Sequence, residues 1–300
     1  MDNLAHTLIG IGVARAGLSK KYGPGTTLTL AVASNLPDVD IAWAIWDPLD
    51  RFLLRRTHSH ALIALPILAA TLAVLLRLRY RDRPWGTLFG LSALGIALHL
   101  LFDLVNAFGV VLLWPFSGRR FELACVFIID PVIWSLLGLP LVGAGFLKTD
   151  DHRLRAWRWA VALVFVYSAA CYAGHLRTAS IVRGLEDLDA RIFPEPLGPH
   201  RFRAAVRDGP AWRVYLIRPL SGAWELRDTV STAADLPEVA AVRATPAGRR
   251  LEAFMAAPVW SVKPDGTIEV EDLRFRSLVV ARGSPLTVRF RPGDPIPQVE

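Results

Sequence analysis

Ionisable side chains interrupt the most apolar stretches of this chain, and this pattern limits what the chain can fold into. Apolar residues make up 53% of the 300 residues and charged residues 20%, and the mean hydropathy is +0.35. That composition is typical of a multi-span membrane protein. An ionisable group in hydrocarbon is costly and needs a partner. The residues concerned are His6, Asp38, Asp40, His58, His60, His99, Asp103 and Asp130.

Six apolar segments can be drawn, at residues 4–18, 26–46, 61–76, 85–107, 121–147 and 157–176. A bilayer crossing needs about 20 apolar residues, so we expect a transmembrane bundle of about six helices, the first and third of them short. The connectors at 20–21, 77–83 and 148–158 carry ten lysines and arginines, and those at 51–56 and 119–120 carry five. The positive-inside rule therefore predicts a multi-pass membrane protein with the first set of connectors in the cytoplasm and the N-terminus outside.

The composition changes after residue 180. Residues 181–200 are rich in proline and glycine and predict a linker. Alternating runs within 212–217, 267–270 and 286–290 predict strands, and Thr245-Pro246 predicts the start of a helix that runs to about Ala256. The expected fold is thus mostly α: a transmembrane metal-binding bundle at 1–180, followed by a small α+β domain at 201–300 that six crossings place in the periplasm.

Two features of the composition exclude other classes of protein. The net charge is +7, but no basic and aromatic module accompanies it, so we do not expect nucleic acid as a partner. Cys125 and Cys171 both lie in apolar segments, which favours packing over a disulfide.

The clearest local signal is the pair His99 and Asp103. Residues four apart share one face of a helix, so the imidazole and the carboxylate point toward a common place. In an apolar helix such a pair is either a neutral hydrogen-bonded couple or two metal ligands.

Two further pairs have a spacing of two. Asp38 and Asp40 would diverge on a helix but share a face in an extended segment, and Pro37 disfavours helix at Leu36. The alternative is that one aspartate caps the following helix. His58 and His60 in an extended strand would present both rings on one side, a common metal-chelating arrangement; the alternative is a solvated interfacial loop.

Other polar residues carry less weight. His6 alone is weak, and Asp130 before Pro131 fits a helix cap as well as a ligand. Asn106 and Glu122 could support ligands through hydrogen bonds. His152, His175 and His200 lie in basic or linker segments and are excluded.

The groups together predict a metal centre. They fall on one side of the expected membrane, and apart from Arg15 no lysine or arginine lies within the helices away from their ends, so the carboxylates would repel each other without a divalent cation. Mixed histidine and aspartate ligation suits Zn²⁺, with Mn²⁺ or Fe²⁺ as alternatives. Such an ion activates water, and Asp38 or Asp40 could act as the general base.

Four motifs also resemble a known family. They are the start Met1–Thr7, the stretch Asn35–Asp40, the stretch Arg56–His60, and the pair His99 and Asp103. Over about residues 1–180 their order and spacing are similar to the YdjM-like family of membrane-bound metal-dependent hydrolases. The resemblance implies an inner-membrane helical hydrolase whose ligands are His6, Asp38, Asp40, His58, His60, His99 and Asp103. The order of the motifs is more loosely similar to the zinc-dependent phospholipase C and nuclease fold, although a second downstream set of histidines and a glutamate is missing.

The function expected first is therefore a membrane-bound metal-dependent hydrolase. It would cleave a phosphoester or a lipid-linked substrate at the outer face of the inner membrane, with membrane lipids and a small-molecule or lipid-linked substrate as partners. A second interpretation is a divalent-metal-binding protein or transporter without enzymatic activity. A third makes the bundle an anchor for a working outer domain. The sequence indicates neither the substrate nor the oligomeric state.

Overall fold

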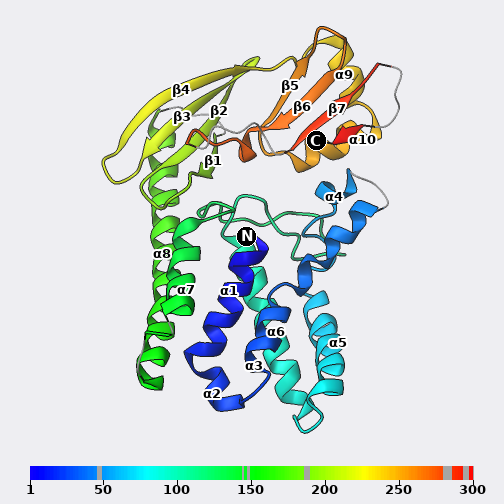
Figure 1. The fold of residues 1–300 in the computed structure, drawn as a ribbon. Coiled ribbons are helices and arrows are strands. Elements are labelled where there is room, and N and C mark those ends of the chain that lie inside the picture. Colours follow the sequence, from blue (N-terminus) through cyan, green and yellow to red (C-terminus); the bar gives the residue numbers. More distant parts are fainter. Residues whose placement is uncertain are drawn as a thin grey trace. The chain divides into compact units, whose positions relative to one another are not determined.

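The computed structural model describes residues 1–45, 49–143, 145–146, 149–185, 190–279, 286–292 and 297–299. The chain divides into two compact units. The helical unit comprises Met1–Ile41, Arg55–Tyr172 and Pro196–Gly198. The sheet unit comprises Ala42–Leu54, Ala173–Glu195 and Pro199–Glu300. Figure 1 shows helices in the first unit and two sheets in the second.

The helical unit begins with a long helical segment that changes its geometry along its length. Helix α1 (Asn3–Val13) passes into a π-helical turn at Ala14–Leu18 and into α2 (Ser19–Tyr22). The other elements follow in order. They are α3 (Thr26–Ala33), a 3₁₀ helix η2 (Leu36–Ile45), α5 (Ala64–Arg79), α6 (Trp85–Leu104), α7 (Pro131–Gly143) and α8 (Asp150–Leu185). The end of η2 from Ala42 and the part of α8 from Ala173 belong to the sheet unit.

Two of the six expected spans have the length of a membrane-crossing helix. Among the described residues, α6 and the Asp150–Gly184 part of α8 are long and apolar enough to cross a bilayer. Helices α5 and α7 have 16 and 13 residues. The segment expected at 26–46 is divided between α3 and the 3₁₀ helix, and residues 121–130 form no helix. Lys148, one of the basic residues used for topology, and the side chain of Arg51 lie outside the described residues.

Small residues bring three helices of the helical unit close together. A Cβ added at Gly95 of α6 would lie 2.5 Å from the Cβ of Ala33 in α3, and one at Gly10 of α1 would lie 2.6 Å from the Leu30 carbonyl oxygen. Contacts this close leave no room for a larger side chain. They fix α6 against the C-terminal end of α3, where residues of the site are found.

The sheet unit contains two antiparallel four-stranded sheets with simple meander order. The first comprises β1 (Ala190–Pro194), β2 (Phe202–Asp208), β3 (Ala211–Arg218) and β4 (Ala223–Ser231). The second comprises β5 (Pro258–Val262), β6 (Ile268–Asp272), β7 (Thr287–Phe290) and β8 (Gln298–Val299). Three short helices, α4 (Asp50–Leu53), α9 (Pro237–Arg243) and α10 (Pro246–Phe254), and the 3₁₀ turn η3 (Leu273–Phe275) complete the unit.

The strands predicted from alternation are confirmed as β3, β6 and β7. Thr245 also caps α10 as expected, because its hydroxyl accepts a hydrogen bond from the Gly248 amide at 3.1 Å. The range 181–200, predicted as a linker, instead holds the end of α8 and strand β1, and residues 186–189 lie outside the described residues. Glu195 in this range is buried and pairs with Arg203 at 3.1 Å. Burial lowers the pKa of Arg203 to about 10, although Glu195 opposes the shift.

Candidate metal centre

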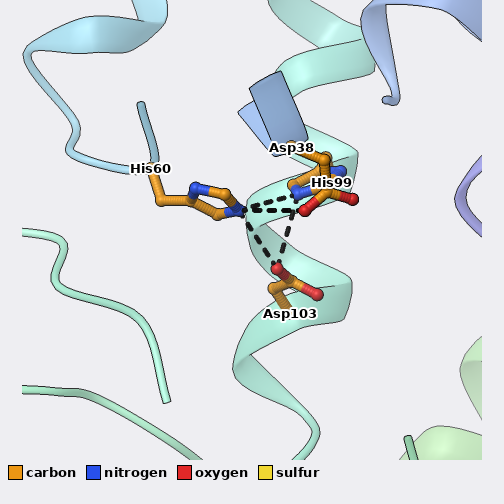
Figure 2. Close-up of side chains that lie close together, drawn as sticks. All are labelled: Asp38, His60, His99 and Asp103. Atoms are coloured by element: carbon orange, nitrogen blue, oxygen red, sulfur yellow. Dashed lines mark hydrogen bonds and ion pairs between the residues drawn. The ribbon is translucent and has the colours of Figure 1, made fainter. Parts of the chain in front are cut away.

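Four buried side chains of the helical unit converge on one point. His60 comes from the turns before α5, Asp38 from the 3₁₀ helix, and His99 and Asp103 from the last turns of α6 (Figure 2). One donor atom from each lies within 4.8 Å of the others. His60 Nε2 is central: it lies 3.0 Å from His99 Nε2, 3.3 Å from Asp103 Oδ2 and 3.9 Å from Asp38 Oδ1. The group is thus two imidazoles and two carboxylates.

Backbone and side-chain acceptors set which nitrogen of each imidazole carries the proton. His99 Nδ1 lies 2.7 Å from the carbonyl oxygen of Ser34, and because a carbonyl only accepts, this nitrogen donates. Ser34 is the C-cap that follows the last residue of α3, so its carbonyl is not used by the helix. His60 Nδ1 lies 3.2 Å from Asp40 Oδ2 and 3.1 Å from the Ser59 hydroxyl oxygen. Both rings therefore turn Nε2 toward the centre of the group.

The 3₁₀ geometry explains how Asp38 and Asp40 reach the same ring from two sides. With three residues per turn, side chains two positions apart point in directions about 120° apart. Asp38 faces His60 Nε2, whereas Asp40 faces His60 Nδ1. Asp40 also accepts a hydrogen bond from the Arg56 amide at 2.6 Å. The expectation of an extended stretch is wrong, and the two aspartates have different positions relative to the site.

Asp103 is held by a dense set of donors. Arg56 Nε lies 2.7 Å from Asp103 Oδ2, and Arg56 Nη1 donates to Asn106 Oδ1 at 2.8 Å. On the other carboxylate oxygen, His6 Nε2 lies at 3.1 Å and the Met1 amino group also forms an ion pair. The inference that the carboxylates lack a countercharge is therefore wrong. The sequence did not indicate it because Arg56 lies outside the apolar segments and reaches the site from a turn.

The remaining predicted residues lie around this group. His6 stacks on His99 with ring centroids 3.8 Å apart and contacts Asp103 Oδ1. His58 lies edge-on against Trp114 at 4.7 Å and outside the four-residue group, because the segment forms turns and not the extended strand that would align it with His60. Asp130 is a helix cap: its Oδ1 accepts hydrogen bonds from the amides of Val132 and Ile133 at 2.9 and 3.3 Å.

Among the second set of predicted residues, Asn106 has the supporting role expected for it. It accepts from Arg56, and its amide nitrogen lies 3.5 Å from Asp103 Oδ1. The Ser34 carbonyl was not foreseen, since a backbone acceptor leaves no mark in the sequence. Arg56 belongs to the Arg56–His60 motif, but nothing in that motif predicts that its side chain is 2% exposed.

The donor set fits a divalent cation. Two Nε2 atoms that both carry a lone pair cannot lie 3.0 Å apart without a proton or a cation near them. Asp103 Oδ2 is buried and receives no well-directed hydrogen bond, although Arg56 lies beside it. Two imidazole nitrogens and two carboxylate oxygens are the donors that Zn²⁺, Mn²⁺ and Fe²⁺ share. The Asp40 and Ser34 acceptors are the supporting hydrogen bonds that metal-ligating histidines usually have.

The site is more open at one ligand than at the others. The side chains of His60, His99 and Asp103 are fully buried, whereas Asp38 is 6% exposed. Next to Asp38 lies the guanidinium of Arg55, 3.4 Å away and 23% exposed. Asn3 donates to the other oxygen of Asp38 at 3.0 Å. The most exposed edge of the group is therefore at Asp38, beside the guanidinium of Arg55.

Comparisons with known proteins agree with the motifs and the composition. Residues 1–177 match the model of the family described as YdjM inner membrane protein. A Bacillus subtilis (strain 168) protein named YfhP is 23% identical over an alignment that covers 96% of this chain and 93% of the relative. No solved structure matches the chain. The matched residues include the whole four-residue group and extend over more than half of the chain. The chain therefore belongs to the YdjM inner membrane protein family.

Proposed function

We propose that this protein is a metal-dependent hydrolase of the inner membrane that acts on a phosphoester or a lipid-linked substrate. The observation that supports it most is the pair of histidine nitrogens, His60 Nε2 and His99 Nε2, that face each other at 3.0 Å beside two carboxylates. Each ring has its Nδ1 bonded to an oxygen acceptor. A buried site so arranged is prepared to bind a cation such as Zn²⁺.

The roles of the residues follow from their positions. His60, His99 and Asp103 would hold the ion from the buried side, and Asp40 and Ser34 keep the two imidazoles oriented. The ion would supply Lewis-acid chemistry, acidifying a water and polarising a phosphoryl or carbonyl oxygen. Asp38 is the most exposed of the four and carries the carboxylate best placed to accept a proton from a reacting water.

The choice of an anionic substrate is supported by Arg55. Its guanidinium lies at the exposed side of Asp38 and is partly solvent-accessible. A guanidinium recognises phosphate through paired hydrogen bonds. A phosphoester, either in a lipid headgroup or in a lipid-linked intermediate, has this chemistry.

The proposal includes the topology predicted from charge. The chain would cross the membrane several times, with the sheet unit in the periplasm and membrane lipids around the helical unit. A membrane-impermeant maleimide applied to intact cells should then label Ser231→Cys, whose position on β4 is exposed. Labelling only after the cells are opened would contradict that orientation.

A different account of the site needs no metal. A doubly protonated His60 could donate from Nδ1 to Asp40 and from Nε2 to His99 or Asp103, leaving a structural hydrogen-bond network. A third account keeps the ion and makes the protein a carrier of divalent metal, since ionisable residues between helices also suit an ion pathway. These two accounts make different predictions from the hydrolase.

One experiment separates them. Metal content is measured on detergent-purified full-length protein, on the double variant His99→Ala/Asp103→Ala, and on the control His152→Ala, which changes an exposed histidine in the first turn of α8. The parent and control should contain equal, stoichiometric metal and the double variant little. Equal and negligible metal in all three would support the metal-free network. Hydrolysis of bis(p-nitrophenyl) phosphate by the parent and control alone supports the hydrolase, whereas metal uptake into vesicles without hydrolysis supports the carrier.

A further inference from the structure

Helix α8 is much longer than a bilayer needs. Its 36 residues span about 54 Å at 1.5 Å per residue, against a hydrocarbon core of about 30 Å. Between Arg158 and Arg177 the helix contains no lysine, arginine, aspartate or glutamate. This uncharged stretch, Trp159–Leu176, is roughly 27 Å long. The end of the stretch at Leu176 and Arg177 therefore marks where the helix leaves the hydrocarbon.

The first sheet of the sheet unit lies against α8 from this boundary onward. A Cβ added at Gly174 would meet the Pro199 carbonyl oxygen at 2.7 Å and the Phe202 ring at 2.9 Å. The ring of Phe202 also lies 6.0 Å from that of His175. Further along the helix, Val182 belongs to the same buried cluster as Ala204 and Val206 of β2. Strand β2 therefore starts at the boundary and runs away from it.

The pairing of the strands shows which other part of the sheet lies at the same end as Phe202. Phe202 is paired with Ile217, and Ile217 is paired with Trp224. The β3–β4 turn, residues 219–222, thus lies at the same end of the sheet as Phe202. The opposite end of the hairpin is Ser231, paired with Ala211. Nine residues of β4 separate the two ends by roughly 27 Å.

The two ends of the hairpin have different chemistry. At the boundary end Leu220 is 86% exposed, Trp224 49% and Leu226 48%. At the other end the exposed side chains are Pro210 and the polar Asp208, Thr229 and Ser231. Strand β4 is also an edge strand. Exposed leucine and tryptophan gathered at the tip of an edge hairpin are typical of a surface that contacts a partner.

Charge indicates what that partner is. Arg177, Arg201 and Arg218 lie at the boundary end, and the exposed acid there, Glu225, is paired with Arg227 at 3.2 Å. Tryptophan and arginine together, at the depth where an apolar helix ends, are the residues that settle at the headgroup level of a bilayer. The partner that fits is an anionic lipid surface.

We propose that the tip of the β3–β4 hairpin, with Leu220 and Trp224, inserts into the lipid headgroup region beside α8. The hairpin is then a second membrane contact of this protein, independent of the metal site. It ties the sheet unit to the bilayer surface at the point where α8 leaves it.

The depth of the hairpin can be measured with nitroxide labels on the full-length protein. Leu220→Cys and the control Ser231→Cys are each labelled after the two buried cysteines, Cys125 and Cys171, are replaced by alanine. Both positions are exposed, so neither label disturbs a core, and equal thermal midpoints verify that both variants fold. The proteins are reconstituted in vesicles of phosphatidylethanolamine and phosphatidylglycerol, and collision rates with oxygen and with a water-soluble nickel chelate are compared.

The expected result is a several-fold higher ratio of oxygen to nickel collisions at position 220 than at position 231. Equal and high nickel collisions at both positions would overturn the proposal. Spin–spin broadening at position 220 that disappears on dilution with unlabelled protein would also overturn it, because a second copy of the chain would then cover the hairpin.

Discussion

Asp40 Oδ2 lies 3.2 Å from Nδ1 of His60, and the same ring turns Nε2 toward His99 and Asp103. The Ser59 hydroxyl oxygen lies 3.1 Å from the same nitrogen, so the carboxylate and the hydroxyl together orient the imidazole with Nε2 toward the group. Because Asp40 also accepts the Arg56 amide at 2.6 Å, it ties the turn that carries His60 to the 3₁₀ helix. Asp40 acts on the site through His60.

Asp40→Ala should weaken metal binding by about 10- to 100-fold without removing a ligand, which is the usual effect of losing a supporting hydrogen bond. Asp40→Asn should have a smaller effect, since its amide oxygen can still accept from Nδ1. Equilibrium dialysis with Zn²⁺ measures the dissociation constant. The control Asp82→Ala removes an exposed carboxylate between α5 and α6 and should bind as the parent does. A complete loss of stoichiometry in Asp40→Ala would mean that Asp40 is itself a ligand.

Substitutions of the two histidines of the Arg56–His60 motif should have opposite effects on metal content. His60→Ala removes the central nitrogen of the group and should abolish stoichiometric metal. His58→Ala should retain it, because His58 lies against Trp114 and outside the group. Elemental analysis of both purified proteins measures the metal content. Loss of metal in both variants would mean that His58 is also a metal ligand.

Some of the site followed from the sequence because local geometry alone determines it. His99 and Asp103 share a face of any α-helix, and their atoms Nε2 and Oδ2 lie 3.4 Å apart. The capping role of Asp130 and the cap of α10 by Thr245 likewise need only neighbouring residues. The strands of the sheet unit were found for the same reason, since alternation is a local pattern.

What the sequence could not show depends on contacts between distant segments or on local backbone choice. Asp38 and Asp40 fit a helix or a strand equally well, and the structure uses a 3₁₀ helix, which gives them different roles. The pairing of Arg56 with Asp103 joins residues 47 positions apart, and a local sequence pattern cannot predict a contact between residues so far apart. Apolar composition also does not distinguish a helix from an irregular segment, since residues 121–130 are apolar without being helical.

Arg56→Met should destabilise the fold by about 3–5 kcal/mol, because it leaves Asp103 as a buried charge without its guanidinium. The loss should be smaller when metal is bound, since the ion also neutralises Asp103. Thermal midpoints in detergent, with Zn²⁺ and with a chelator, measure both effects. Arg55→Met is the matched control: its ion pair with Asp38 is 3.4 Å long and partly exposed, and such pairs contribute about 0–1 kcal/mol. Equal midpoints for the two variants would contradict the prediction.

The sheet unit should lose stability in acid through Glu269. Burial acts to raise the pKa of this carboxyl, but hydrogen bonds from Lys263 and Arg289 outweigh it and lower the pKa below its usual range. The stabilisation is therefore complete above the unfolded-state pKa of about 4.3 and is lost as the pH falls through the lower folded-state value. Hydrogen–deuterium exchange in β5, β6 and β7, corrected for intrinsic rates, should show less protection below about pH 4. Glu269→Gln should be less stable than the parent at neutral pH, and its stability should fall less as the pH is lowered. An unchanged pH profile would exclude Glu269 as the cause.

Helix packing and metal binding should be coupled through Gly95. A Cβ there would lie 2.5 Å from the Cβ of Ala33 and 3.2 Å from the Ser34 amide nitrogen, so α6 must move away from the end of α3. His99 lies one turn after Gly95 and donates to the Ser34 carbonyl, so the same movement lengthens that hydrogen bond. Gly95→Ala should therefore cost about 1–3 kcal/mol of stability and also weaken Zn²⁺ binding.

The same helix provides the control. A Cβ at Gly90 meets nothing within 4 Å, so Gly90→Ala should leave the thermal midpoint and the dissociation constant for Zn²⁺ unchanged, or raise the midpoint slightly because alanine favours helix. If Gly95→Ala lowers the midpoint but leaves Zn²⁺ binding intact, the Ser34 carbonyl does not orient His99 in the way the site requires. If both substitutions are neutral, the close approach of α6 to α3 is not what fixes the position of His99.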